Sequence, residues 1–499
     1  MAEVLAGAGV LARASWTVWR RHTATALGGA PRVVDAGIVV ALVLCAALAA
    51  LVSTFIAGTL TAAGELPAEV PRTPFLRITA AGAVVGGALP QLLLAATRPR
   101  SSALGDLAAV LPVGAAARVV GERLPTVLLG TAFSLVLASP LGVLLVTLYA
   151  HEPARAAGAL SAHLGLLVLA ALAIPSAFEL VYSAAARARL PHAYAAGAAA
   201  VVVLAGLLAA SGPYLVPAPR PDAEVPLSPL EAVAQLATTS EPSRALLASA
   251  ILVAWALVVA ALVALALRFP SRLATAEHTR MLVGAPLPRG RVAAGVAVHA
   301  LALVRLPQFL ILGAGSLVLA VALATPAARE LELLTHPLTS VPLVAPFAIG
   351  MFAFGLTHGT SWWVRGVGAD APRIAAERLA AAAVVGAVPA VASAAVLLGT
   401  GTVDAANAAQ RLGVGVALCL AASLGGVLVP WSQQSPLATT ITSAASFAIF
   451  ALAIVPLQLI ADGRPEPTAW IALAASVALL AAGWIAATRR RRVDDLAIA

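Results

Sequence analysis

Two short charged stretches of this apolar chain match each other: residues 118–124 read RVVGERL and residues 373–379 read RIAAERL. The matching positions are all 255 residues apart (373 − 118 = 255). The same offset relates the GAP tripeptides at 29–31 and 284–286. Because two separated matches share one offset, the sequence predicts an internal duplication. Each copy would carry an Arg/Glu/Arg cluster directly before a hydrophobic stretch: Arg118, Glu122 and Arg123 in the first, and Arg373, Glu377 and Arg378 in the second.

The composition indicates an all-α polytopic membrane protein, because 61% of the 499 residues are hydrophobic and only 11% are charged. All 31 basic residues are arginine. A chain without lysine has no P-loop and forms no Schiff base, so any ATP that drives it must be bound by another polypeptide. Cys45 and Cys419 both lie in apolar runs, which indicates neither a disulfide framework nor a cysteine metal site.

About 20 predominantly apolar residues are needed to cross the hydrocarbon core of a membrane. By this criterion the sequence predicts twelve transmembrane spans, six in each half. The spans are expected near residues 37–60, 76–96, 124–148, 159–182, 193–211, 245–267, 308–324, 339–357, 379–399, 412–430, 437–461 and 469–487.

The predicted halves are residues 1–267 and residues 268–499. The first begins with a helix whose Trp16 and Trp19 are three residues apart, a spacing that places both indoles on one face for the lipid headgroup region. We therefore expect an interfacial helix along the inner leaflet. In the second half we expect segment 268–305 to be interfacial as well.

The arginines set the expected orientation. If the N-terminus is cytosolic, 23 of the 31 arginines lie in cytosolic segments, and eight lie outside. This bias agrees with the positive-inside rule, so both termini are expected in the cytosol and the protein in the plasma membrane. The arginines flank spans and are not interleaved with aromatic residues, so no nucleic-acid partner is expected.

The longest predicted outer loop, residues 212–244, contains a helix-start signal. Ser228 precedes Pro229, and Glu231 follows at the third position. Leu230, Val233, Ala234 and Ala237 then recur at helical spacing and form one apolar stripe. We expect a short helix lying on or dipping into the outer leaflet. The loop near 462–468 is too short to hold a counterpart.

Candidate catalytic residues are few. The sequence contains no HExxH motif, nucleophile elbow or Gly-rich phosphate loop, and its eight histidines are scattered singly. A lone histidine such as His163 or His299 is expected to be a packed or interfacial residue. Glu179 lies near the inner end of its span, and no carboxylate is placed at mid-membrane. We expect neither a catalytic, a cofactor nor a metal site on this chain. The lack of a mid-membrane acid favours transport energised from outside the membrane over ion-coupled transport.

The order of interfacial helix, two spans, basic loop, four spans and outer helix before the sixth span resembles the ABC-2 type permeases, the membrane subunits of ATP-driven exporters. LPVGAAARVVGERL (111–124) is similar to the short Leu-Pro-Val segment of that family, and GAPLPRGRV (284–292) looks like a second copy. The resemblance implies a cytosolic ABC ATPase partner, expected in two copies, which would rest on a coupling surface. Arg118, Glu122 and Arg123 would lie on or beside one such surface, and Arg373, Glu377 and Arg378 on the other.

The resemblance predicts a permease, not an enzyme, that exports a hydrophobic or amphipathic small molecule. Two other functions remain open: a proton-coupled antiporter of the twelve-span type, and a membrane-embedded transferase that uses Glu65 and Glu69. The charged clusters also have a simpler interpretation. Arg118 and Glu122, four residues apart, would form a surface pair worth about 0.3–0.5 kcal/mol that anchors the helix at the headgroups.

Overall fold

A computed structural model describes most of the chain. The described residues are 2–26, 31–62, 72–97, 110, 113–149, 152–215, 227–239, 241–269, 284, 286–325, 338–358, 371–429, 431, 442–443, 445–454 and 466–497. Every regular element within these ranges is a helix, and they contain no strand.

The helices up to residue 268 are α1 (Ala2–Ala26), α2 (Pro31–Ala62), α3 (Arg72–Thr97), α5 (Ala115–Leu148), α6 (Pro153–Arg187), α7 (His192–Leu215), α8 (Pro229–Thr238) and α9 (Pro242–Arg268). The later elements are α10 (Arg291–Val304), α11 (Pro307–Leu323), α14 (Ser340–Val344), the 3-10 helix η1 (Ala345–Ile349), α15 (Gly350–His358), α17 (Ala371–Gly399), α18 (Ala405–Leu428) and α20 (Glu466–Ala497). Residues Ala445–Ile454 are also helical.

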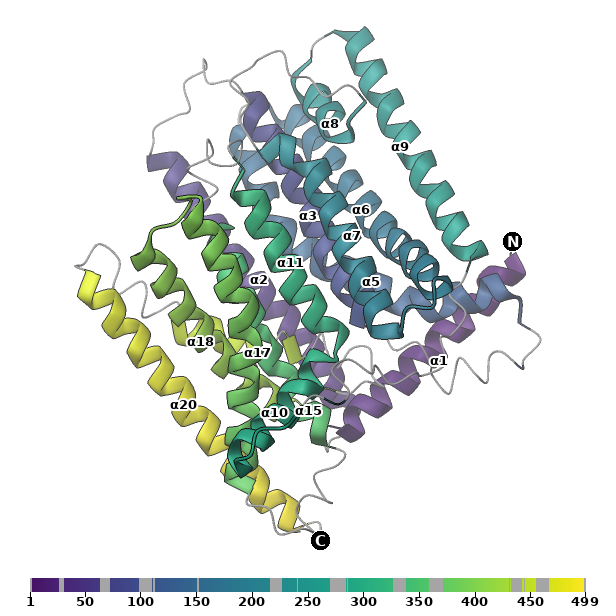
Figure 1. The fold of residues 1–499 in the computed structure, drawn as a ribbon. Coiled ribbons are helices and arrows are strands. Elements are labelled where there is room, and N and C mark those ends of the chain that lie inside the picture. The colour runs from purple at the N-terminus through teal and green to yellow at the C-terminus, as the bar shows by residue number, and fades with distance from the viewer. Residues whose placement is uncertain are drawn as a thin grey trace.

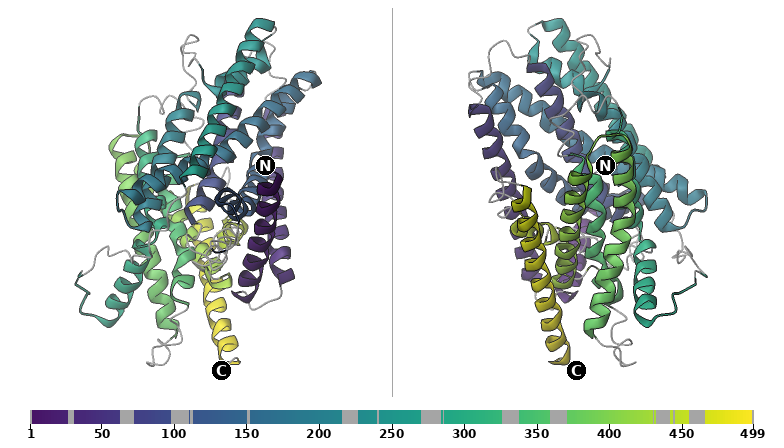
Figure 2. Two further views of the ribbon diagram at one scale, coloured as in Figure 1. Left: turned by 90° about the vertical axis from the view of Figure 1, so that its right-hand side faces the viewer. Right: turned by 60° about the vertical axis from the view of Figure 1, so that its left-hand side comes forward.

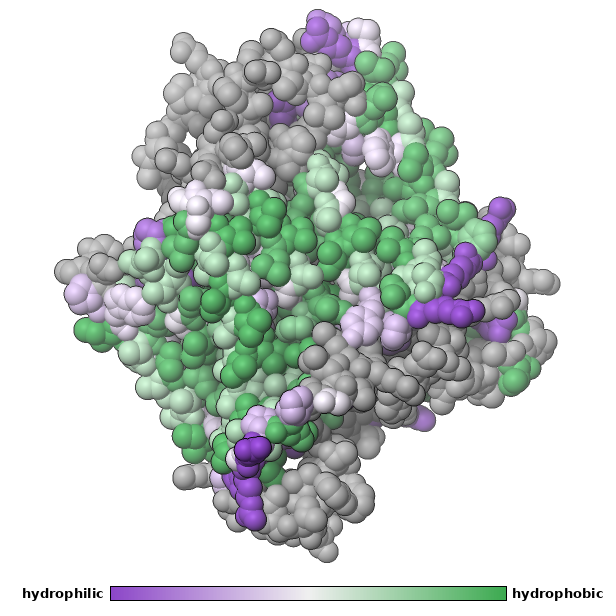
Figure 3. All heavy atoms as spheres, in the orientation of Figure 1, coloured by the Kyte–Doolittle hydropathy of each residue, from purple (hydrophilic) through white to green (hydrophobic). Residues whose placement is uncertain are grey.

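The described helices are those of a polytopic membrane protein. Eight of them are long and apolar enough to cross a membrane, and the bent pair α10–α11 would make a ninth. Described side chains on the face shown in Figure 3 are mainly hydrophobic across its middle, and hydrophilic side chains gather at its margins. This distribution fits a bundle surrounded by lipid hydrocarbon.

The count of twelve spans stays a prediction: the predicted spans overlap described helices, but not all of them as one long helix. α2 covers the first predicted span. The span expected at 339–357 is divided among α14, η1 and α15, and the one expected at 437–461 is described as a helix only over parts of 442–454. Periodicity and hydropathy locate apolar segments, whereas breaks within them depend on packing.

Prolines mark several helix starts. Pro153, Pro229, Pro242 and Pro307 occupy the first turn of α6, α8, α9 and α11. Proline is tolerated there because backbone N–H groups in the first turn of a helix have no carbonyl partner within the helix. The lack of an N–H in proline therefore costs no hydrogen bond. The side chain of Asp404 caps α18 by accepting a 2.8 Å hydrogen bond from the backbone N–H of Asn407. Other prolines lie inside helices α3, α5, α6 and α17.

Two helices lie across the bundle instead of running along it. α1 crosses the ends of other helices and packs on α5 and α2 (Figure 1). α10 meets α11 at 79° and packs on α17. Trp19 of α1 is only 6% exposed and lies in a cluster with Val34, Leu129 and Phe133. The expected lipid-facing role is therefore wrong for Trp19, because α2 and α5 cover this face of α1.

Helix α8, predicted for the outer side, starts where the sequence predicts. The hydroxyl of Ser228 accepts a hydrogen bond from the backbone N–H of Leu230 at 3.3 Å. The predicted apolar stripe is buried, with Val233 fully covered, because α8 packs against α3, α6 and α9. α8 therefore packs its apolar stripe into the protein instead of turning it to the outer leaflet.

The halves meet through α7 and α11. A side chain at Gly197 of α7 would lie 2.7 Å from Cβ of Leu310, so the glycine permits the close approach of α11. α9 and α20, which end the two halves, lie at opposite edges of the bundle (Figures 1 and 2). Among the eight candidate spans, these two have the smallest share of residues buried inside the protein: 11% in α9 and 17% in α20.

The 255-residue offset holds in one region of the fold. Shifting α5 by 255 positions gives residues 370–403, which nearly matches α17 at 371–399. The GAP match does not mark equivalent positions: Pro31 begins α2, whereas Pro286 lies before α10. The offset is local because the connections between corresponding helices differ in length.

Candidate functional site

The first charged cluster lies in the first three turns of α5. Arg118 and Glu122 are partly buried, and Arg123 reaches the adjacent helix α6. Its Nη2 atom lies 3.4 Å from Oε2 of Glu179, whose side chain is only 5% exposed. Ion pairs in such a setting are costly to break, because removing one partner leaves a buried charge. Arg123 and Glu179 thus link the start of α5 to the C-terminal part of α6.

α1 contacts this cluster through Gly121, which lies between Val120 and Glu122. A Cβ atom at position 121 would lie 2.6 Å from Cβ of Leu11 and 2.8 Å from the carbonyl oxygen of Ala8. Neither separation is possible for a real side chain without movement of α1 or α5. The absence of a side chain at Gly121 therefore lets α1 lie directly against the charged turn.

The second cluster occupies the equivalent start of α17. Nε of Arg373 donates a 2.8 Å hydrogen bond to Oε1 of Glu377 within the helix. Glu377 is 7% exposed, and its carboxylate lies so close to Gly295 of α10 that a Cβ atom at position 295 would overlap it. A short transverse helix, α10, therefore packs on the charged start of α17, as α1 packs on that of α5.

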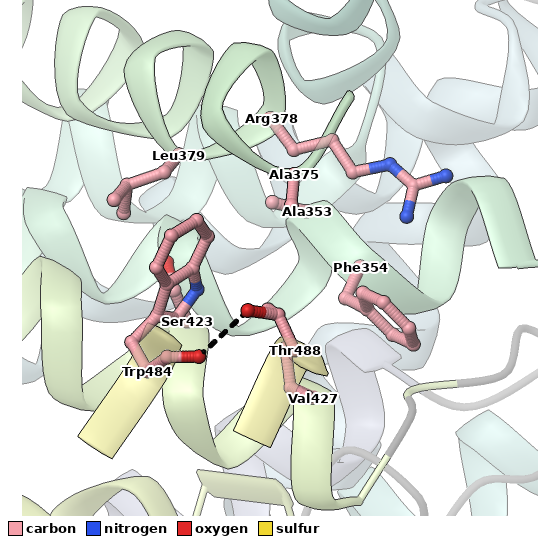
Figure 4. A pocket seen from close by; sticks show the side chains of 9 residues that line it. All are labelled: Ala353, Phe354, Ala375, Arg378, Leu379, Ser423, Val427, Trp484 and Thr488. Atoms are coloured by element: carbon pink, nitrogen blue, oxygen red, sulfur yellow. Dashed lines mark hydrogen bonds between the residues drawn. The ribbon is translucent and has the colours of Figure 1, made fainter. Parts of the chain in front are cut away.

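Arg378 points toward a different neighbour from Arg123. Its guanidinium carbon lies 5.3 Å from the centre of the Phe354 ring of α15, within the range of a cation–π contact. Figure 4 shows both side chains at the edge of a small crevice with Trp484 and Thr488 of α20. The hydroxyl of Thr488 donates to the carbonyl oxygen of Trp484 at 3.0 Å. The crevice is thus lined by residues of α15, α17, α18 and α20.

The structure thus keeps each predicted trio together on one helix and joins each to a transverse helix. α5 and α17 are not among the helix pairs that pack extensively, so the two trios form separate sites. The simpler surface-pair interpretation fits only part of this geometry. Arg373 and Glu377 do form an i,i+4 pair, but the carboxylate of Glu377 is buried between two helices.

A third polar cluster, separate from the two charged clusters, lies around α8. Arg77 of α3 binds both carboxylate oxygens of Glu231 through one edge of its guanidinium, with Nε donating to Oε2 at 2.8 Å and Nη2 to Oε1 at 2.9 Å. Nearby on α3, the hydroxyl of Thr79 lies 2.9 Å from Nε2 of His163, which is buried as expected for a packed histidine. Tyr149 donates from its hydroxyl to the carbonyl oxygen of Ala237 at 3.1 Å.

The sequence did not predict this outer cluster. Glu231 has the position of a helix-capping acid, and only tertiary structure places it against an arginine 154 residues earlier. A carboxylate directly beside an apolar stripe that is to be buried is the signal that could have indicated a partner of opposite charge.

The described side chains form no metal-binding group of three or more histidine, cysteine or acidic residues. Glu65 and Glu69, proposed for a transferase, lie outside the described residues. No family model, curated protein or solved structure matches this chain. Its function must therefore be inferred from the geometry of the helices and their charged groups.

Proposed function

We propose that the chain is the membrane permease of an exporter driven by a separate ABC ATPase, with two six-span repeats in one polypeptide. The observation that carries this proposal is the repeated packing of a transverse helix on a charged helix start. α1 lies against α5 at Gly121, and α10 lies against α17 at Glu377. Each of these paired elements would contact one copy of a partner protein and transmit the partner's movement to the helix bundle.

The pattern of helix contacts supports the two repeats. α2 packs on α5 and α11 on α17, while α5 packs on α6 and α17 on α18. α6 and α18 in turn contact the last helix of their halves, α9 and α20. These parallel contacts persist although the connecting segments differ in length, and a duplicated ancestor would explain both facts.

The six charged residues would divide into two roles. Arg373 is exposed and available to a partner protein. Glu377 and Arg378 are buried, and Arg123 is tied to Glu179, so these would act by holding the coupling segments in position. Arg118 and Glu122 are partly buried and lie beside α1.

Under this proposal ATP is bound by the partner, since the chain has no lysine for a P-loop. Both termini would lie in the cytosol and the bundle in the plasma membrane. The cargo class would be hydrophobic or amphipathic small molecules, which can reach the bundle from the lipid.

The test is co-purification of an ABC ATPase with this chain from its native membrane, together with export of the amphipathic dye rhodamine 6G from cells that express both proteins. Glu122→Ala, Glu377→Ala and the double variant are compared at matched expression. We expect reduced partner binding, or ATP hydrolysis without export, in both single variants. Glu241→Ala is the control, because Glu241 forms an exposed pair with Arg244 just before α9. Wild-type binding and export in the double variant would refute the coupling role.

One observation favours a second candidate, the proton-coupled antiporter. Glu179, Glu231 and Glu377 are all buried, and buried carboxylates in membrane helices commonly belong to ion pathways. Each of the three is within ion-pair distance of an arginine, which favours the charged form and a structural role. Export that continues without any ATPase and stops when the proton gradient is collapsed would favour the antiporter.

A further inference from the structure

The two charged clusters are equivalent in sequence but are attached to different helices. Arg123 and Arg378 are 255 positions apart and hold the same place in the RxxxERL pattern. Arg123 is paired with Glu179 on α6, the helix that follows α5 in the chain. Arg378 lies over Phe354 on α15, the helix that precedes α17.

The lengths of the neighbouring helices account for this difference. α6 continues to Arg187 and carries Glu179 on its last three turns. α18, which occupies the corresponding place beside α17, ends at Leu428.

The chemistry of the two contacts also differs. A guanidinium–carboxylate pair is held by opposite charges and breaks at a high cost when it is buried. A guanidinium over an aromatic ring is held by the attraction of a cation to the ring face and needs no opposite charge. The first contact therefore joins α5 to α6 through an ion pair, and the second joins α17 to α15 through an aromatic ring.

We propose that Glu179 and Phe354 are positioning residues that make the two coupling sites unequal: movement of α5 is passed to α6, and movement of α17 is passed to α15. This inference rests on the proposed function, since it assigns an output to each coupling site. The first site then moves a long helix that spans the first half. The second moves α15, which is one part of a broken span.

The test is hydrogen–deuterium exchange of the purified complex of this chain with its ATPase, with and without ADP–vanadate to trap the partner. The peptides of interest cover residues 176–187 of α6 and residues 350–358 of α15. In the wild type, trapping should change exchange in both peptides. Glu179→Gln should abolish the change in α6 and leave that in α15, and Phe354→Leu should do the reverse.

Conservative variants separate positioning from general destabilisation. Glu179→Asp keeps the charge and Phe354→Trp keeps an aromatic face, so both should retain the wild-type response. Glu241→Ala, which removes only an exposed ion pair with Arg244, should also respond like the wild type. If Glu241→Ala behaved like Glu179→Gln, or if each variant abolished both responses or neither, the assignment of separate outputs would be refuted while the exporter proposal stood. If the wild-type protein forms no complex with an ATPase, or if ADP–vanadate changes hydrogen–deuterium exchange in neither peptide, the exporter proposal and this inference are both overturned.

Discussion

At the scale of single residues, the contacts with the greatest energetic weight are buried ion pairs. The Arg77–Glu231 pair is bidentate, and Glu231 is 5% exposed. Replacing one member leaves the other charge buried without its partner. Such a change typically costs about 3–5 kcal/mol.

We therefore expect Glu231→Ala to lower the stability of the detergent-purified protein by about 3–5 kcal/mol, measured by thermal unfolding. The matched control is Glu241→Ala, which removes a pair whose side chains are 68% and 59% exposed. That loss should be below about 1 kcal/mol. Equal effects of the two substitutions would show that the outer pair does not hold α8.

The residue scale also shows where sequence reasoning reaches its limit. The offset between the RxxxERL motifs identified Glu122 and Glu377 as equivalent, and both lie at the start of a long helix. It could not show that Arg123 would meet Glu179 while Arg378 would meet Phe354. Those partners depend on where α6 and α18 end, and hydropathy does not specify helix ends to within a few turns.

At the scale of elements, the transverse helices depend on glycine contacts. Gly121→Ala should force α1 from α5, because the added methyl would overlap the backbone of Ala8. Overpacking of this kind costs about 1–3 kcal/mol. We expect faster tryptic cleavage within α1, measured on gels. In Gly9→Ala, where nothing lies within 4 Å of the new methyl, cleavage should stay at or below the wild-type rate.

The start of α18 should respond to acid. Hydrogen bonds from the backbone and side-chain N–H groups of Asn407 lower the pKa of Asp404. Since the folded-state pKa is below the unfolded one, the cap stabilises the protein above the ordinary aspartate pKa of about 3.9 and is lost as pH falls through the lowered value.

The difference in thermal stability between wild type and Asp404→Ala should therefore be constant near neutral pH and shrink below about pH 4. Thermal unfolding of both proteins across this range checks it. A difference that grows with acid would contradict the capping role.

Element positions were mostly predictable, and their surroundings were not. The start of α8 at Pro229 follows from local capping chemistry, which the chain carries in sequence. The burial of α8 and of Trp19 depends on helices distant in sequence. An amphipathic face predicts that something apolar covers it, but lipid and protein satisfy the same pattern.

At the scale of the whole molecule, the predicted orientation can be tested by labelling. Cys45 and Cys419 are first replaced by alanine, and single cysteines are then introduced at Ala154, Thr402 and Ala293. We expect an impermeant maleimide to label the first two in intact cells, since both precede or follow spans at the predicted outer side. Ala293→Cys on α10 should react only after the membrane is opened. Labelling of Ala293→Cys in intact cells would contradict the predicted cytosolic location of α10.

The length of α6 has a consequence for the membrane around the protein. Its 35 residues make a rod of about 52 Å at 1.5 Å per residue. The hydrocarbon layer is only about 30 Å thick, so this rod must tilt or extend into the headgroups. Because Arg123 ties α5 to α6, a change of tilt would be felt at the first charged cluster and much less at the second. Bilayers built from shorter or longer acyl chains should therefore alter one half of the protein before the other.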